Sequence, residues 1–232
     1  MISGVIFDKD GTLFDFNATW GAWSAGMIAA EAGGDPDLTA QLADVLGYDL
    51  NGRVFRPGSI VIASTVQEVA DAILSVVPGD RAALLQRMDA HAGQVGQVAA
   101  ADLPDLMGAL DAMGLKLGIA TNDSEAPARL HLDRAGIVDA FDFIAGYDSG
   151  FGGKPAPGQL LGFCAATGLD PAACVMVGDS THDLHAGRAA GMRTVGVLTG
   201  PAPDAELAPL ADAVLASVAE LPGWIASVNK ND

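Results

Sequence analysis

Two aspartates stand directly after a short apolar run near the start of the chain. Residues 5–7 are Val-Ile-Phe, and Asp8-Lys9-Asp10-Gly11-Thr12 follows them. Because Asp8 and Asp10 are two positions apart, an extended chain projects both carboxylates to the same side, and Gly11 permits a sharp turn after them. Facing a phosphate, one carboxylate can attack as a nucleophile while the other exchanges a proton with the leaving group. The pair therefore predicts phosphoryl chemistry.

Three later segments carry polar side chains that complement this pair, and each comes after a short apolar run. Thr121 and Asn122 offer neutral donors for phosphoryl oxygens, and Lys154 offers a positive charge. Asp179 ends an apolar run and Asp183 follows one helical turn later, so both are expected near one point. Singly, each segment is an ordinary turn, surface charge or helix cap. Their joint order after four strands favours one site.

The carboxylates predict a metal ion. Asp8, Asp10, Asp179 and Asp183 would repel one another, and their pKa values would rise, unless a cation joined them. Oxygen ligands without a cluster of His or Cys favour Mg²⁺, which binds one or two carboxylates together with phosphate oxygens. We therefore expect Mg²⁺ as the cofactor.

The elements that must position these residues alternate along the chain. Short apolar runs separated by helical stretches are typical of an α/β fold, in which a parallel sheet is covered on both faces. In such folds the ligand site lies at the carboxyl ends of the strands. The expected strands are residues 4–7, 115–120, 143–145, 174–178 and 194–198, and the expected core helices are 102–113, 125–135, 158–167 and 184–190.

One interval breaks this alternation. About 100 residues separate the first two expected strands, far more than a helical crossover needs. Helical patterns at 19–32, 38–46, 66–76 and 80–95 occupy the interval. We predict a core domain formed by residues 1–16 and 100–232, with a mostly helical domain, 17–99, inserted into it.

Composition narrows the partners. With 29 acidic and 12 basic side chains the formal net charge is −17, which disfavours nucleic acid and anionic membranes as partners. The chain shows no signal peptide and no run near the roughly 18–20 apolar residues of a membrane span, so a cytoplasmic protein is expected. Cys164 and Cys174 are expected to be small buried hydrophobic residues. No sequence feature fixes the oligomeric state.

These motifs, in this order, resemble those of the haloacid dehalogenase (HAD) superfamily, specifically its phosphatases with a C1-type helical cap inserted after the first strand. The resemblance covers essentially the whole chain. It implies a Rossmann-like sheet and hydrolysis of a small phosphorylated metabolite through an aspartyl-phosphate. The dehalogenase branch lacks the second aspartate of the first motif, so the presence of Asp10 argues against dehalogenation.

The resemblance also implies a role for each motif residue. Asp8 would be the nucleophile and a Mg²⁺ ligand, and Asp10 the general acid/base, with its backbone carbonyl reaching the metal. Thr121 and Lys154 would hold the phosphoryl group, with Asn122 as a further donor. The last motif would complete the metal site: Asp179 would ligate Mg²⁺, and Asp183 would orient a metal-bound water or the lysine.

The substrate rests on a narrower similarity. Residues 146–158 and 177–192 resemble the corresponding segments of phosphoglycolate phosphatases, which implies 2-phosphoglycolate as the substrate. In the inserted domain, Arg53 and Arg56 are candidates for its carboxylate, because arginine pairs with carboxylates in a bidentate manner. An ordinary surface salt bridge is the alternative for each arginine.

Other activities remain open or are excluded at this point. A sugar phosphomutase would use the same chemistry with a different acceptor. A serine esterase built on Ser180 and His182 would need a nucleophile elbow or an oxyanion loop, and we find neither. A P-loop is excluded, because its first glycine position holds Asp148 and Pro155 follows Lys154 where Ser or Thr is required.

Overall fold

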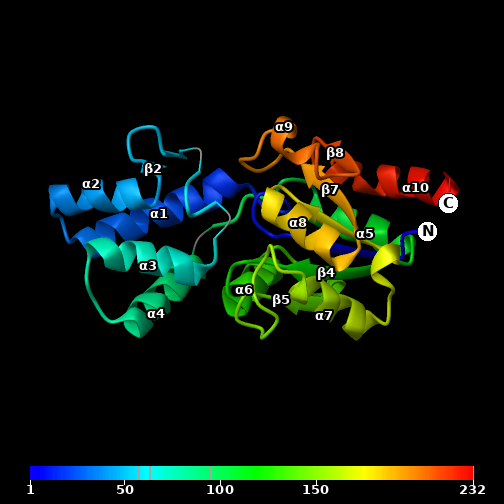
Figure 1. Cartoon of the computed structure of the whole chain (residues 1–232), viewed down its shortest axis with the longest axis horizontal. Coiled ribbons are helices and arrows are strands. Elements are labelled where there is room, and N and C mark those ends of the chain that lie inside the picture. The colour runs from blue at the N-terminus through cyan, green and yellow to red at the C-terminus, as the bar shows by residue number, and fades with distance from the viewer. Residues whose placement is uncertain (57, 63, 95, 232) are drawn as a thin grey trace. The chain divides into compact units, whose positions relative to one another are not determined.

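The chain divides into two compact units. The computed structural model describes residues 1–56, 58–62, 64–94 and 96–231, and Figure 1 shows it as a ribbon. One unit is Met1–Phe16 with Gln97–Asp232, and the other is Asn17–Gly96. From the sequence we predicted that the second segment of the first unit begins at residue 100. In the structure residues 97–99 also belong to this unit, because the amide of Asp15 donates to the carbonyl of Val98 at 2.8 Å and Phe14 forms a β-bridge with Ala99.

The first unit is built on a six-stranded parallel sheet. Its order is β5-β4-β1-β6-β7-β8, and every neighbouring pair is parallel. Val5 of β1 lies between Leu117 and Val175 in register, which places the first strand at the centre. The predicted α/β fold is confirmed. The strands are β1 (Gly4–Phe7), β4 (Lys116–Ala120), β5 (Phe143–Ala145), β6 (Cys174–Gly178), β7 (Arg193–Val197) and β8 (Ala213–Leu215).

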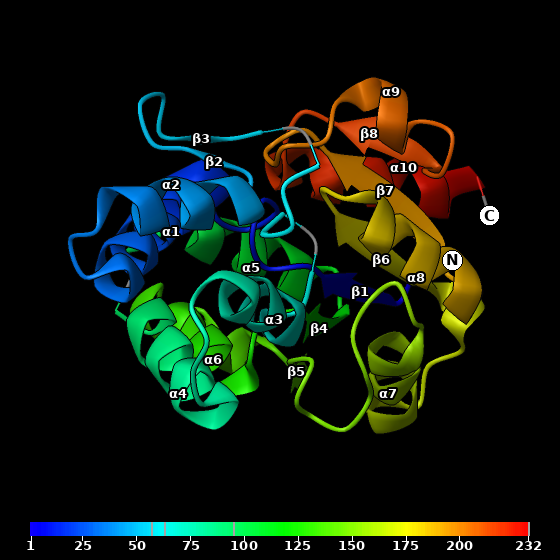
Figure 2. The same ribbon diagram turned by 60° about the vertical axis from the view of Figure 1, so that its left-hand side comes forward.

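Helices cover both faces of this sheet (Figures 1 and 2). Alternate side chains of a strand point to opposite faces, so Val5 and Phe7 join one apolar cluster and Ile6 joins another. The first cluster packs against α5, α6 and α10, and the second against α7 and α8. The α-helices are α5 (Leu103–Ala112), α6 (Glu125–Arg134), α7 (Gly158–Thr167), α8 (Thr181–Ala190), α9 (Asp204–Leu207) and α10 (Leu221–Asn231), with 3-10 turns at Val138–Ala140, Pro171–Ala173 and Val218–Glu220.

Several features of the first unit differ from the sequence prediction, among them helices α9 and α10, which were not predicted. The sixth strand, β8, was also not predicted; it lies at the edge of the sheet, and its three residues are only half-buried. Helix α8 begins at Thr181, three residues before the predicted start at Leu184. Ser180 caps it, since the Ser180 hydroxyl accepts from the amide of Asp183 and the Asp183 carboxylate accepts from the amide of Ser180. This cap fixes Asp183 at the first turn of the helix.

The second unit is mostly helical, with one small hairpin. Trp23 and Met88 are buried in its interior, where the Trp23 indole donates to the carbonyl of Met88 at 3.4 Å. Thr65 and Glu68 form a capping box at the start of α3. The elements are α1 (Phe16–Ala32), α2 (Pro36–Val45), β2 (Tyr48–Asp49), β3 (Val54–Phe55), α3 (Val66–Val76) and α4 (Arg81–Ala92), of which β2 and β3 pair antiparallel.

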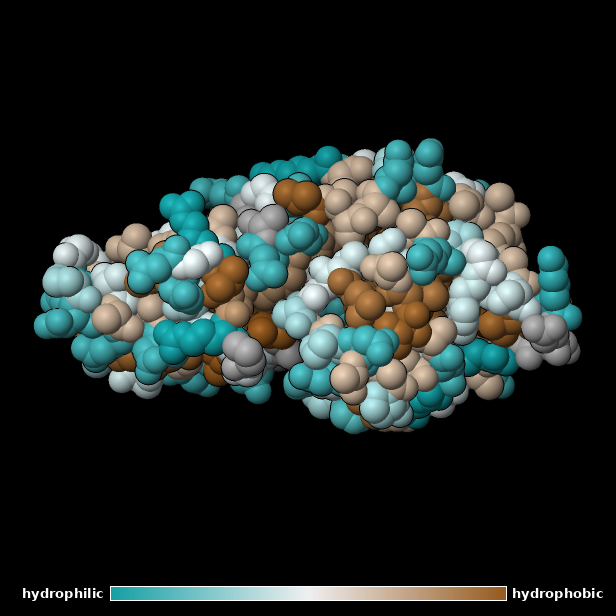
Figure 3. Space-filling view, turned by 90° about the horizontal axis from the view of Figure 1, so that it is seen from above, coloured by the Kyte–Doolittle hydropathy of each residue, from teal (hydrophilic) through white to brown (hydrophobic). Residues whose placement is uncertain are grey.

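On the face shown in Figure 3, hydrophilic and hydrophobic residues are intermixed, and strongly hydrophobic residues gather in a patch. Among the described residues, no helix is long and apolar enough to cross a membrane.

Candidate active site

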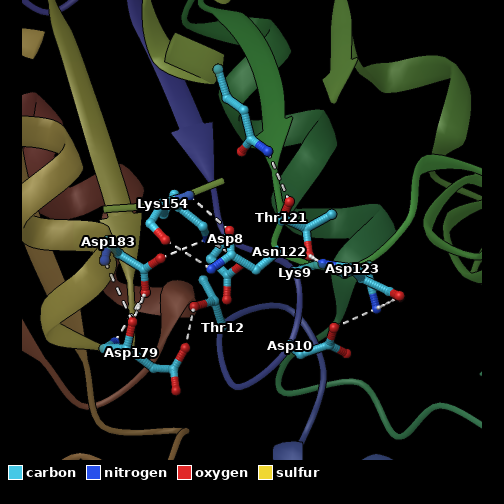
Figure 4. A network of polar contacts seen from close by, with 12 residues as sticks. Asp8, Lys9, Asp10, Thr12, Thr121, Asn122, Asp123, Lys154, Asp179 and Asp183 are labelled. Carbon is cyan, nitrogen blue, oxygen red and sulfur yellow. Dashed lines mark hydrogen bonds and ion pairs between the residues drawn. The ribbon is translucent and has the colours of Figure 1, made fainter. Parts of the chain in front are cut away.

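The predicted site residues of the first unit gather on the loops that follow the parallel strands (Figure 4). Asp8 follows β1, Thr121 follows β4 and Asp179 follows β6. Because these three strands are neighbours and parallel, their carboxyl ends meet at one edge of the sheet. Lys154 reaches this edge from the loop between β5 and α7.

Lys154 joins two of these loops. Its Nζ donates to Asp8 Oδ1 at 2.7 Å and to Asp183 Oδ1 at 2.6 Å, and its side chain is buried. The other oxygen of Asp183 accepts from the amide and hydroxyl of Ser180, at 3.0 and 2.7 Å. Asp183 is thus engaged at both oxygens and fixes the position of the lysine. The ammonium faces Asp8 directly.

A group of three carboxylates surrounds this contact. Asp8, Asp179 and Asp183 each offer an oxygen, and these oxygens all lie within 4.8 Å of one another. All three residues are buried. Asp179 Oδ1 accepts from the hydroxyl of Thr12 at 3.2 Å. Three buried carboxylates around one ammonium leave an excess of negative charge, and a divalent cation fits that donor set.

The pKa values of the site residues reflect this excess of negative charge. Burial raises the pKa of Asp8 to about 7, and the neighbouring Asp183 adds to the rise against the opposing effect of Lys154. Burial likewise raises the pKa of Asp179, with Asp183 and Asp8 contributing. Burial lowers the pKa of Lys154, but Asp183 and Asp8 outweigh it and the net shift is upward. The lysine stays charged, while the carboxyl groups of Asp8 and Asp179 hold their protons more strongly than exposed ones do.

Two glycines leave room around Asp179. A Cβ on Gly11 would lie 2.2 Å from Asp179 Oδ2, and a Cβ on Gly200 would lie 1.8 Å from the same atom. Gly11 also has a φ of +79°, which few side-chain-bearing residues adopt. Thr199 ties its loop to this turn, because its hydroxyl donates to the carbonyl of Gly11 at 2.6 Å. The loop after β7 is therefore a further part of the site.

A second ionic group lies beside the first, around Lys9. This lysine is fully buried, and its Nζ lies 2.6 Å from Asp10 Oδ2 and 3.5 Å from Asp123 Oδ2. It also lies 3.2 Å from His131 Nδ1. Burial lowers the pKa of Lys9, but Asp10 and Asp123 outweigh it and raise the pKa overall. Figure 4 shows the Asp10 carboxylate with Lys9 and Asp123, apart from the Asp8 group.

Comparison with known proteins decides the family. Residues 2–191 match the family model of the haloacid dehalogenase-like hydrolases. A phosphoglycolate phosphatase of Xylella fastidiosa (strain 9a5c) is 34% identical over 197 residues, covering 84% of this chain and 80% of that protein. The chain belongs to the haloacid dehalogenase-like hydrolases.

Two further similarities show how widely the family extends. An N-acetylmuramic acid 6-phosphate phosphatase of Pseudomonas aeruginosa is 28% identical, covering 86% of this chain and 83% of that protein. The crystal structure of a haloacid dehalogenase-like hydrolase from Bacteroides fragilis superposes on this chain with a TM-score of 0.76. The two sequences are 20% identical, and the match covers 95% of this chain and 100% of that one. Within its family, this hydrolase is a phosphatase.

The structure places Thr121 and Asn122 of this phosphatase differently from one another. Thr121 is buried at the strand end, where its hydroxyl accepts from the amide of Asp123 at 3.1 Å and keeps its own proton to donate. Asn122 was predicted to contact substrate. That contact stays a prediction; the side-chain amide also holds the main chain of Lys154, accepting from the nitrogen at 2.8 Å and donating to the carbonyl at 3.0 Å. Asn122 therefore positions the lysine segment.

The two candidate arginines lie in the other unit. Arg56 donates to Asp44 at 2.8 Å on the surface, which is the ordinary salt bridge given as its alternative. Arg53 is exposed at the turn of the β2–β3 hairpin, where its φ is +54°. The geometry within this unit therefore favours Arg53 over Arg56 as the arginine available to a ligand.

Sequence reasoning missed the Lys9 group, although its residues stand inside or next to the motifs. A lysine between two aspartates is normally solvated, and His131 carried no pattern of its own. The available signal was that Lys9 follows a fully buried strand and precedes a turn, so its side chain has to enter the core. Gly200 gave no local signal, because its role depends on the approach of Asp179 from a distant loop.

Proposed function

We propose that this phosphatase is a Mg²⁺-dependent phosphomonoesterase that hydrolyses a small phosphorylated metabolite through an aspartyl-phosphate on Asp8. The observation that carries the proposal is the contact of Lys154 with both Asp8 and Asp183, within a buried group of three carboxylates. It puts a nucleophilic oxygen next to a fixed positive charge, which is the environment a phosphoryl group requires.

The chemistry would proceed in two displacements. A carboxylate oxygen of Asp8 attacks phosphorus, the bond from phosphorus to the ester oxygen breaks, and Asp10 gives its proton to the departing oxygen. Asp10 then accepts a proton from a water molecule, whose oxygen attacks the same phosphorus. The bond between phosphorus and Asp8 breaks, which releases phosphate and restores both carboxyl groups. Lys154 and the Thr121 hydroxyl hold the phosphoryl oxygens throughout.

Mg²⁺ would be held at the carboxylate group. Asp8 and Asp179 are its strongest candidate ligands, with the Asp10 carbonyl beside them. Asp183 is a weaker candidate, because both of its oxygens already accept from Lys154 and Ser180. When bound, Mg²⁺ would neutralise negative charge on the phosphoryl oxygens.

We further propose 2-phosphoglycolate as the substrate, with the second unit serving as the cap that recognises its carboxylate. The relative of Xylella fastidiosa supports this choice, and the exposed Arg53 supplies a suitable cation. The relative named N-acetylmuramic acid 6-phosphate phosphatase makes that sugar phosphate the first competitor to test.

The test of the chemistry is phosphate release from a panel containing 2-phosphoglycolate, N-acetylmuramic acid 6-phosphate and p-nitrophenyl phosphate, with Mg²⁺ or with EDTA. We expect turnover only with Mg²⁺. Asp8→Asn keeps the size of the side chain and removes the nucleophile, so it should lower kcat by more than about a hundredfold. Steady release without an added bisphosphate excludes the phosphomutase alternative. Chelator-resistant turnover would refute the proposal.

The substrate is tested with the arginines as a matched pair. Arg53→Ala should lower kcat/KM for 2-phosphoglycolate. The loss of transition-state stabilisation should be roughly 1.5–3 kcal/mol, the value of a charged hydrogen bond. The same variant should change p-nitrophenyl phosphate turnover little, because that substrate has no carboxylate. Arg56→Ala is the control and should affect both substrates weakly. Equal losses of Arg53→Ala on both substrates would contradict the carboxylate role.

A further inference from the structure

Asp10 is held from one side only. Its Oδ2 lies 2.6 Å from Lys9 Nζ, while its Oδ1 is buried without a hydrogen-bond partner among the described residues. A buried carboxylate oxygen without a partner is costly, and its retention calls for an explanation. An acid/base group has this requirement: one oxygen must be fixed, and the other must be available for a proton of the reacting molecule.

Lys9 is itself surrounded by three polar side chains. Its ammonium reaches Asp10, Asp123 and His131, at 2.6, 3.5 and 3.2 Å. Asp123 is anchored in turn, because its Oδ1 accepts from the amide of Ser124 at 2.8 Å. Asp10 and His131 are within hydrogen-bond distance, whereas Asp123 Oδ2 forms a longer ion pair with the ammonium and, within the described ranges, no hydrogen bond. The lysine is therefore fixed in direction as well as in charge.

His131 completes the frame from helix α6. It is fully buried, and both Lys9 Nζ and Gln97 Nε2 approach its Nδ1, at 3.2 and 3.3 Å. Since an ammonium group can only donate, Nδ1 is the acceptor and a neutral ring carries its proton on Nε2. His131 thus directs Lys9 without adding a charge. Asp123 lies just before α6 and His131 lies within it, so one segment of chain supports the lysine.

The group gives little net stability for its burial. Removing an ammonium and two carboxylates from water costs several kcal/mol per ion, which their mutual attraction only partly offsets. Apolar residues of similar volume would often be as stable. What the ion pairs supply is a defined geometry for the Asp10 carboxylate.

We propose that Lys9 is a positioning residue for Asp10. Anchored by Asp123 and His131, it fixes Oδ2 of the carboxylate and leaves Oδ1 without a partner in the described part of the chain, available to the leaving-group oxygen. This inference rests on the proposed function, because it assigns Asp10 the acid/base step. Lys9 contacts the Asp10 carboxylate and acts through it.

The test compares two substrates of similar shape, phenyl phosphate and p-nitrophenyl phosphate. Phenoxide is the poorer leaving group and depends more on a proton from Asp10. Lys9→Met removes the ammonium and keeps an unbranched side chain. It should lower kcat for phenyl phosphate about tenfold or more, a part of the range of roughly 10²–10⁴ for acid/base catalysis. The loss on p-nitrophenyl phosphate should be smaller, and KM for both should change less than about threefold.

A double-mutant cycle separates positioning from folding. In an Asp10→Asn background, Lys9→Met should change kcat for phenyl phosphate less than about twofold, because the group on which Lys9 acts is already gone. A structural role would cost activity in both backgrounds. Equal losses of Lys9→Met on both substrates, or an undiminished loss in the Asp10→Asn background, would overturn the inference.

A second variant covers the case in which Lys9→Met does not fold. Lys9→Met with Asp123→Asn removes one charge of each sign and should show the same selective loss on phenyl phosphate. Failure of both variants to fold would assign Lys9 a structural role and overturn the inference. Wild-type phosphate release is the separate criterion for the enzyme itself. Its absence would overturn the proposed function, whereas release with equal losses would overturn only the role of Lys9.

Discussion

Lys154 and Lys9 are both buried lysines, and each is held between a carboxylate of the first loop and a carboxylate of another loop. Lys154 joins Asp8 to Asp183, and Lys9 joins Asp10 to Asp123. The difference lies in what surrounds them. Around Lys154 a third carboxylate, that of Asp179, leaves the negative charge in excess. Around Lys9 the additional neighbour is a neutral imidazole.

This difference explains how one sheet edge can serve two purposes. The carboxylates around Lys154 outnumber its single positive charge, so this group favours a bound cation. The raised pKa values of Asp8 and Asp179 reflect the excess of negative charge. Lys9, which contacts Asp10 and His131 directly and pairs with Asp123 at a longer distance, is a fixed support. Asp8 and Asp10 are alternate residues of a single loop. Asp8 thereby belongs to the group proposed to bind the cation, and Asp10 belongs to the group in which Lys9 holds a carboxylate in place.

The largest expected effect separates the two lysines directly. Lys154→Met removes the positive charge facing Asp8, so kcat should fall by about 10²–10³ or more, the loss typical of a group that stabilises developing charge. Phenyl and p-nitrophenyl phosphate should suffer alike, because the phosphoryl group is common to both. Steady-state kinetics on the two substrates measure the ratio. A selective loss on phenyl phosphate, as expected for Lys9→Met, would erase the distinction.

Metal removal should affect only one of the two groups. Mg²⁺ at a hundred times its Kd stabilises the folded state by roughly 2.7 kcal/mol, so EDTA should lower the unfolding midpoint by several degrees. Lys9→Met should keep this response to Mg²⁺. Asp179→Asn, which preserves the size of the side chain and removes a charged ligand, should lose most of it. Thermal unfolding of the three proteins with and without Mg²⁺ is the measurement, and a full response in Asp179→Asn would contradict the metal assignment.

A smaller effect is expected at Asn122, which acts on Lys154 through the main chain. Asn122→Ala removes two hydrogen bonds to the Lys154 backbone, worth about 1–3 kcal/mol of stability together. Displacement of the lysine should lower kcat about tenfold with little change in KM. Asn122→Asp keeps the acceptor and should lose less. A rise in KM with kcat unchanged would instead support the predicted contact between Asn122 and substrate.

The loop positions could be predicted from the sequence because they depend on local patterns. Short apolar runs placed β1 and β6, and a parallel sheet brings Asp8 and Asp179 to one edge whatever the details. The α8 cap was recognisable only in part, since Asp183 was treated as a site residue rather than as the capping partner of Ser180.

The contacts within the site could not be predicted, because they depend on side chains that meet across loops. Lys9 pairs with His131, which is 122 positions away, and Asn122 holds Lys154 from 32 positions away. Spacing rules describe residues on one helix or strand and carry no information at such separations. The hairpin at Arg53 was also not predicted, because its two-residue strands are too short to show an alternating pattern.

The smallest expected effect comes from an exposed lysine that serves as the control for both buried ones. Lys116 Nζ lies 2.7 Å from Asp142 Oδ1 on the surface of the first unit. Lys116→Met should leave kcat unchanged and lower the unfolding midpoint by less than about 3 °C at pH 7.

The pH dependence of this small stability difference follows from Asp142, the partner of Lys116. Burial raises the pKa of that carboxyl, but the hydrogen bonds from Lys116 and the Leu117 amide outweigh it and lower the pKa overall. A carboxyl with a lowered pKa in the folded state stabilises the fold above its unfolded value and loses this contribution as pH falls. The difference between wild type and Lys116→Met should therefore shrink when unfolding is followed from pH 7 toward pH 3. An effect on kcat as large as that of Lys9→Met would mean that burial is not what distinguishes the site lysines.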